Sequence, residues 1–178
     1  MNEIRIRLDK GLYRYLKFLE KMRLVDSKEE AIIEAITIYK KLNMQDWLPY
    51  VYRSGQERIL LINQGMFNDI IISMSETKLY EIARISALKR SVLKQMDPEL
   101  DLCDPEDWDV ILNELQNLGW GKFTRKNDEI MVEFLGVPIN FVKGYLETMF
   151  HVVFKVMKPN IPDVFILIVD KDARKVWL

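Results

Sequence analysis

Residues 3–8 read Glu3-Ile4-Arg5-Ile6-Arg7-Leu8, and this stretch decides how the N-terminal part folds. Because a β-strand turns successive side chains to opposite faces, the three aliphatic residues share one face and the charged residues share the other. A strand this short is not stable alone, and no second strand follows closely enough to form a hairpin. The stretch therefore predicts pairing with the same strand of a second copy, as a two-stranded antiparallel ribbon.

The residues after this strand predict two amphipathic helices. Asp9 is placed to cap a helix over about 10–23, and Ser27 begins Ser27-Lys28-Glu29-Glu30, a capping-box pattern that opens a second helix to about Leu42. Leu24-Val25-Asp26 forms the turn between them. The expected apolar stripes are Leu12, Leu16, Leu19 and Met22 in the first helix and Ala31, Ile32, Ala35, Ile36, Tyr39 and Leu42 in the second.

With this strand, these leucines and this helix opening in order, residues 1–42 resemble the ribbon-helix-helix family, the MetJ/Arc class of dimeric DNA-binding proteins. The resemblance implies that the outward ribbon residues Glu3, Arg5 and Arg7 read base edges in the major groove. It also implies that Ser27 and Lys28 clamp a phosphate, a role that the positive end of a helix dipole favours independently. One departure stands at Leu24, where family members often have glycine.

Composition limits the remaining possibilities. Residues 1–44 hold 10 Lys and Arg against 7 Asp and Glu, while the whole chain has a net charge of −1, so the basic excess lies where DNA would bind. The single cysteine, Cys103, excludes an intrachain disulfide and fits a reducing compartment. No apolar run is long enough to span a membrane, and no signal-peptide pattern opens the chain. We therefore expect a cytoplasmic protein.

The fold class predicted for the whole chain is α+β, with a DNA-binding and dimerisation domain over 1–44 and a second domain over 54–178. The second domain is expected to have an antiparallel sheet and about three helices. The second domain is similar to ligand-binding modules of the vinyl-reductase and haem-NO-binding type, in the order of its elements only. That order is a helix, the sequence Leu-Gly-Trp-Gly, a hairpin and a helix that contains a glycine. The expected elements are strands at 57–62, 121–125, 130–134, 164–169 and 174–178 and helices at 75–96, 105–118 and 141–155, with a turn at 66–69 and either a short strand or a helix start at 70–72.

No catalytic motif occurs in the sequence, so we expect no enzyme, no cofactor and no metal site. His151 is the only histidine and is more typical of a structural residue than of a ligand. The acidic residues between Asp97 and Asp107 lack the glycine and the spacing of a calcium loop and favour a solvated loop. A bulky stripe from Phe141 to Met157 is most typical of core, and it is also consistent with an apolar ligand pocket or a dimer interface.

These patterns predict a dimeric transcription regulator that binds double-stranded DNA. Its second domain would sense a small-molecule effector or extend oligomerisation beyond the dimer. Two alternatives stay open. The alternating strand is also typical of any half-exposed edge strand. The chain is also consistent with a protein-interaction factor, such as an antitoxin or a partition protein, for which DNA binding is secondary.

Overall fold

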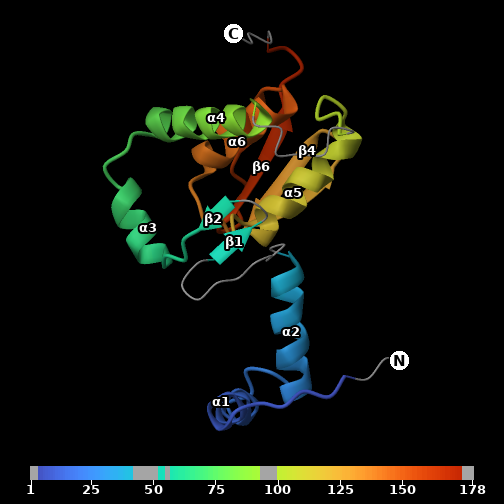
Figure 1. The fold of residues 1–178 in the computed structure, drawn as a ribbon. Helices are drawn as coiled ribbons and strands as arrows, with labels where there is room; N and C mark the ends of the chain where they lie inside the picture. The colour runs from blue at the N-terminus through green and yellow to red at the C-terminus, as the bar shows by residue number, and fades with distance from the viewer. Residues whose placement is uncertain (1–3, 42–51, 55–56, 93–99, 174–178) are drawn as a thin grey trace. The chain divides into compact units, whose positions relative to one another are not determined.

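The computed structural model describes residues 4–41, 52–54, 57–92 and 100–173 (Figure 1). The chain divides into two compact units, residues 1–60 and 61–178, and each is described by itself. The predicted domain bounds, 1–44 and 54–178, stay a prediction, because most of the stretch between them lies outside the described residues. Within the described residues, no helix is long and apolar enough to cross a membrane.

The first unit contains the two predicted helices, α1 (Lys10–Lys21) and α2 (Lys28–Lys41), followed by a short antiparallel pair, β1 (Tyr52–Ser54) and β2 (Glu57–Ile59). Asp9 caps α1 as predicted, since its carboxylate accepts from the backbone N–H groups of Gly11 and Leu12. Residues 4–9 have no regular secondary structure. The predicted ribbon is thus not seen in a single chain, which lacks the partner strand that would supply its hydrogen bonds.

The turn after α1 is a Schellman motif. Met22 is the C-cap, the N–H of Arg23 bonds to the carbonyl of Glu20 at 3.1 Å, and the N–H of Leu24 bonds to the carbonyl of Leu19 at 3.0 Å. Arg23 adopts the left-handed conformation with φ of +55°, which favours glycine. Arg23, and not Leu24, therefore occupies the backbone position at which a glycine is common.

The second unit is α+β, as predicted. Its four-stranded sheet has the order β3-β4-β6-β5, and all neighbouring strands are antiparallel. The elements are α3 (Gln64–Ile71), α4 (Glu76–Val92), the 3-10 turn η1 (Pro105–Asp107), α5 (Trp108–Asn117), β3 (Lys122–Lys126), β4 (Glu129–Glu133), α6 (Ile139–Phe150), β5 (Phe154–Met157) and β6 (Val164–Val169). The hairpin β3–β4 confirms the sequence prediction. Asp104 followed by Pro105 is the sequence pattern of a helix start, and Asp104 does cap η1.

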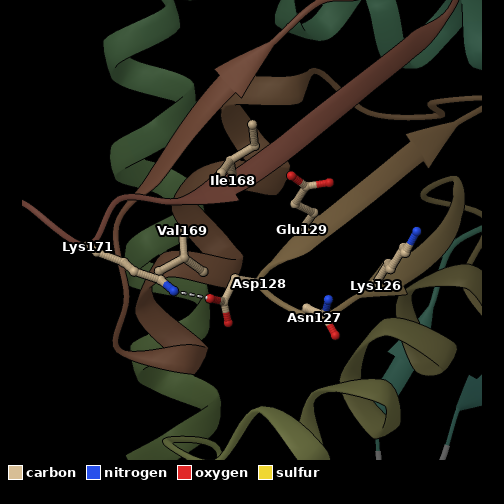
Figure 2. Close-up of a pocket in the computed structure, with 7 residues that line it drawn as sticks. All are labelled: Lys126, Asn127, Asp128, Glu129, Ile168, Val169 and Lys171. Carbon is tan, nitrogen blue, oxygen red and sulfur yellow. Dashed lines mark ion pairs between the residues drawn. The ribbon is translucent and has the colours of Figure 1, made fainter.

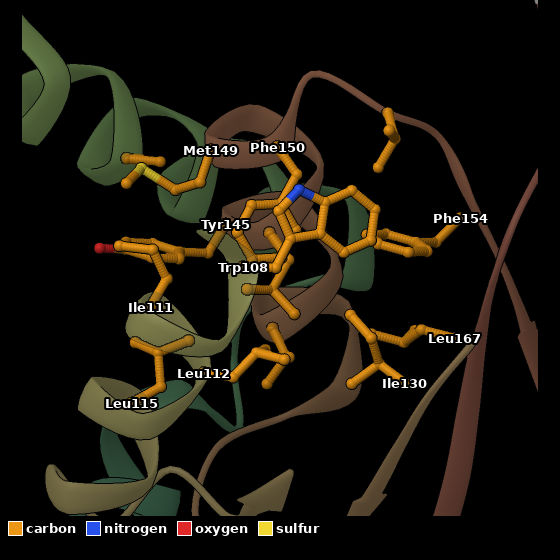
Figure 3. Packing of buried hydrophobic residues seen from close by; sticks show 14 of the residues in the cluster. Trp108, Ile111, Leu112, Leu115, Ile130, Tyr145, Met149, Phe150, Phe154 and Leu167 are labelled. Atoms are coloured by element: carbon orange, nitrogen blue, oxygen red, sulfur yellow. The ribbon is translucent and has the colours of Figure 1, made fainter. Parts of the chain in front are cut away.

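The core lies between one face of this sheet and helices α5 and α6 (Figure 3). Trp108 stacks on Phe150 with ring centroids 4.4 Å apart and meets Phe154 edge to face. The inner face of the sheet contributes Ile130 and Leu167, which are fully buried. Most of the bulky stripe from Phe141 to Met157 packs here. Its buried residues are therefore part of the core.

Helix α4 lies against α6 (Figure 1). Small residues allow this close approach: Ala83 and Ala87 are fully buried, and a Cβ on Gly144 would lie only 2.4 Å from the carbonyl oxygen of Tyr80. The helical pattern of 75–96 places five residues on the inner face: Leu79, Ile82, Ala83, Ile85 and Leu88. Leu79 and Ala83 are buried and Ile82 is partly buried, whereas Ile85 and Leu88 are exposed. Because the two backbones come so close, the contact line holds small side chains rather than large ones.

Three further predictions differ from the structure. The predicted turn at 66–69 lies inside α3, and the ambiguous segment 70–72 contains the end of that helix. The predicted helix 141–155 ends at Phe150, because His151 turns left-handed with φ of +55°, and Phe154–Met157 then pairs with β6. The first predicted strand forms only over Glu57–Ile59, and the final strand at 174–178 lies outside the described residues.

Candidate nucleic-acid interface

The ribbon segment is exposed in the single chain. Arg5 and Arg7 lie on the surface in irregular backbone, and Glu3 lies outside the described residues. The aliphatic residues of the segment are also uncovered: Ile4 is 82% exposed and Ile6 is 54% exposed. The segment therefore presents both its apolar and its charged side chains to solvent.

The two helices behind this segment form no core of their own. Between Ile4 and Lys40 no side chain is buried. Helix α1 leaves Phe18 half exposed, and α2 leaves Ile33 and Ile36 each 61% exposed. Helix α2 is apolar around much of its circumference, which is typical of a helix that is covered on several sides. Taken alone, this segment lacks the buried apolar area that holds two helices together.

The start of α2 is closed by its own side chains. The Oγ of Ser27 accepts from the backbone N–H of Glu30 at 3.0 Å, which confirms the first half of the predicted capping box. The carboxylate of Glu30 accepts from the N–H of Asp26 at 2.7 Å, one residue before the position that the motif uses. Ser27 is thus occupied with capping, and its role at a phosphate stays a prediction.

Lys28 forms an ion pair that the sequence did not predict. Its Nζ donates to both carboxylate oxygens of Glu20, at 2.9 and 3.2 Å, and this hydrogen bonding raises the pKa of Lys28. The two side chains keep 27% and 37% of their surface exposed. Glu20 lies in the last turn of α1 and Lys28 in the first turn of α2, so the pair spans the turn that contains Arg23. A spacing of eight residues across an irregular turn carries no periodic signal, which is why sequence reasoning missed Glu20.

The second unit holds a buried carboxylate between three elements. Glu147 of α6 is 3% exposed; it accepts from the hydroxyl of Tyr80 on α4 at 2.5 Å and from the N–H of Phe154 on β5 at 2.6 Å. Burial and the bond to Glu147 raise the pKa of Tyr80 to about 12. Both Glu147 oxygens are engaged by these donors, so the group serves to join α4, α6 and β5.

Two open hollows lie on the surface of the second unit. One, of about 460 Å³, lies at the β3–β4 turn and the end of β6, where Lys171 pairs with Asp128 at 2.6 Å (Figure 2). The other, of about 650 Å³, lies beside Phe134, Gly136 and Phe165. Neither encloses a ligand-sized space with convergent polar groups of the kind that defines a small-molecule site.

Three of the acidic residues considered for a metal role hold the local backbone, while Asp97 and Glu99 lie outside the described residues. Asp104 caps η1, and Asp101 and Asp107 hold the loop before it through backbone N–H groups. His151 ends α6 and is exposed. Across the part of the chain that the structure describes, no three His, Cys, Asp or Glu side chains gather as a metal site would require.

No protein-family model matches the chain, and no curated protein matches it either.

Proposed function

We propose that the chain is a dimeric, sequence-specific DNA-binding transcription regulator of the cytoplasm. Two copies would pair through residues 3–8, and the resulting antiparallel ribbon would enter the major groove. The proposal combines the alternating Ile/Arg sequence with the two helices that follow it.

The observation that carries the proposal is the absence of a buried side chain between Ile4 and Lys40. A folded segment of this size needs apolar burial to offset its conformational entropy. Covering an isoleucine or leucine contributes about 1.5–3 kcal/mol. A second copy would offer the same aliphatic strand and the same helix faces, so a two-fold pairing would bury Ile4, Ile6 and Leu8 of both chains at once.

Pairing would also order the charged side chains. In a strand, Arg5 and Arg7 project from the face opposite the isoleucines, so a ribbon would carry four arginines on one surface. Each arginine can bond in a bidentate manner to a guanine edge, and Glu3 can accept from a cytosine amino group. Ser27 and Lys28 would contact phosphate and fix the register of the protein on the duplex.

The second unit would carry a separate role, as an effector-sensing or oligomerisation module. It has its own aromatic core, so its fold does not depend on the ribbon. Which of the two roles it has would be tested by native mass spectrometry, because a retained small molecule favours the sensor.

The test is sedimentation of the whole chain together with gel-shift titration on duplex DNA at two salt concentrations. We expect a dimer at micromolar concentration whose affinity falls steeply with salt. Lys28→Ala should weaken binding to every sequence alike, whereas Lys40→Ala at the far end of α2 is the matched control. A folded monomer contradicts the proposal, and a dimer that binds a partner chain but no DNA supports an interaction factor instead.

A further inference from the structure

We propose that Glu20 competes with DNA phosphate for the ammonium group of Lys28, and so sets the strength of the sequence-independent part of DNA binding. This inference rests on the proposed function, and it adds a residue that the ribbon-helix-helix resemblance does not supply.

The geometry of the pair defines the competition. The ammonium of Lys28 has three N–H donors, and it reaches both oxygens of the Glu20 carboxylate at 2.9 and 3.2 Å. A phosphate offers the same kind of acceptor, a charged oxygen. For a phosphate to take over these donors, the ammonium must leave Glu20 wholly or in part.

The pair is accessible to such an exchange. Both side chains keep part of their surface exposed, 27% for Lys28 and 37% for Glu20, so a phosphate can approach without unfolding either helix. Ion pairs that water can reach contribute little to stability. The pair is therefore weak enough for a phosphate to displace it.

Further acidic groups lie near Lys28. Glu29 also stabilises the charged ammonium, and the carboxylate of Glu30 is held beside Asp26 at the start of the same helix. Lys28 is thus a cation with acidic neighbours rather than part of a basic patch. Removing the one carboxylate that bonds to it directly should release its charge toward DNA.

The consequence concerns affinity and not base preference. Phosphate contacts are the same for every sequence, while bases are read in the groove. Glu20 should therefore lower the affinity for all duplexes by one common factor. The base preferences assigned to Arg5 and Arg7 should be unaffected.

The test is a gel-shift titration of the full-length chain on one preferred and one unrelated duplex. Glu20→Gln should strengthen binding to both by the same factor, roughly 2- to 30-fold for two sites in a dimer. Glu20→Asp, whose shorter side chain keeps the charge but reaches less far, should give a smaller gain. Glu34→Gln removes the same charge from α2 and is the matched control; it should change affinity less than Glu20→Gln.

A double-mutant cycle with Lys28→Ala separates the direct effect from general charge. If Glu20 acts through Lys28, Glu20→Gln should give no gain beyond that of Glu34→Gln when Lys28 is alanine. Equal gains from Glu20→Gln and Glu34→Gln, or an undiminished gain without Lys28, overturn the inference and leave the proposed function standing. Weaker binding by both Glu20 variants with helix content and dimer unchanged also overturns it. A wild-type chain that enriches no preferred duplex from a random library, and so binds none in the titration, refutes the proposed function itself.

Discussion

Replacing Gly144 with alanine should destabilise the second unit through the contact between α4 and α6. The added Cβ would lie 2.4 Å from the carbonyl oxygen and 3.1 Å from the carbonyl carbon of Tyr80, and ordinary contact begins near 3.4 Å. The two helix backbones would have to separate by about 1 Å at this point. Overpacking of this kind costs about 1–3 kcal/mol, and because the clash is with backbone we expect the upper end.

The helix preference of alanine offsets part of this cost. Alanine is favoured over glycine in a helix interior by about 1 kcal/mol, which leaves a net loss of about 2 kcal/mol. Urea unfolding followed by tryptophan fluorescence measures it, since Trp108 is buried against Phe150. Gly65→Ala in α3 is the matched control: its Cβ would meet nothing nearer than the Asn63 oxygen at 3.4 Å, so stability should stay level or rise. An equal response from Gly144→Ala and Gly65→Ala would refute the close-packing argument.

Three further predictions concern single side chains. Ile6→Asp should abolish the dimer, seen as a halved mass in sedimentation equilibrium, because pairing would bury the new charge; an unchanged dimer means that residues 3–8 do not form its core. Arg23→Gly should raise the stability of the first unit by about 0.5–1 kcal/mol, because φ of +55° strains an arginine. Thermal unfolding at fixed protein concentration measures the change. A loss of stability would show that the contacts of the arginine side chain matter more than the strain of its backbone. The folded state favours the neutral hydroxyl of Tyr80, so its contribution to stability is present below pH 10 and is lost as pH rises toward 12. Tyr80→Phe should therefore reduce the fall in the free energy of unfolding between pH 10 and 12, as measured by urea unfolding. The same fall in the wild type and in Tyr80→Phe would contradict the role given to the Glu147 bond.

Elements with strong local signals were predictable from sequence. The hairpin of β3 and β4 has alternating residues on both sides of a polar turn, and Asn127 in that turn adopts a left-handed conformation. Asp104 followed by Pro105 marks the start of η1, and Gly119, with φ of +80°, follows the C-cap of α5. In each case a few neighbouring residues determine the backbone.

Elements that depend on distant partners were not predictable. Phe154–Met157 continues an apolar helical pattern, and it becomes β5 because β6 supplies its hydrogen bonds. The helical pattern places Ala83 correctly on the inner face of α4, but it also places Ile85 and Leu88 there. Both are exposed, and the contact near Gly144 holds Ala87 beside Ala83 instead. Both outcomes depend on tertiary packing that overrides local preference.

The candidate interface also has one feature that local sequence determines and one that depends on a distant residue. The cap by Ser27 follows from local sequence, whereas the pairing of Lys28 with Glu20 depends on how the turn at Arg23 brings the two helices together. The proposed ribbon would need a strand from a second chain, and residues 4–9 of the single chain have no regular secondary structure.

The central claim is that two copies read DNA through a shared ribbon, and selection of binding sites from a random duplex library tests it most directly. A symmetric ribbon predicts enrichment of a site with two half-sites related by two-fold symmetry, because operator symmetry mirrors that of the dimer. Arg7→Ala should relax the preference at one position in each half-site while Lys28→Ala leaves the preferences unchanged. Failure to enrich any sequence, or enrichment of a site whose preferences are the same in the wild type and in Arg7→Ala, would contradict the account.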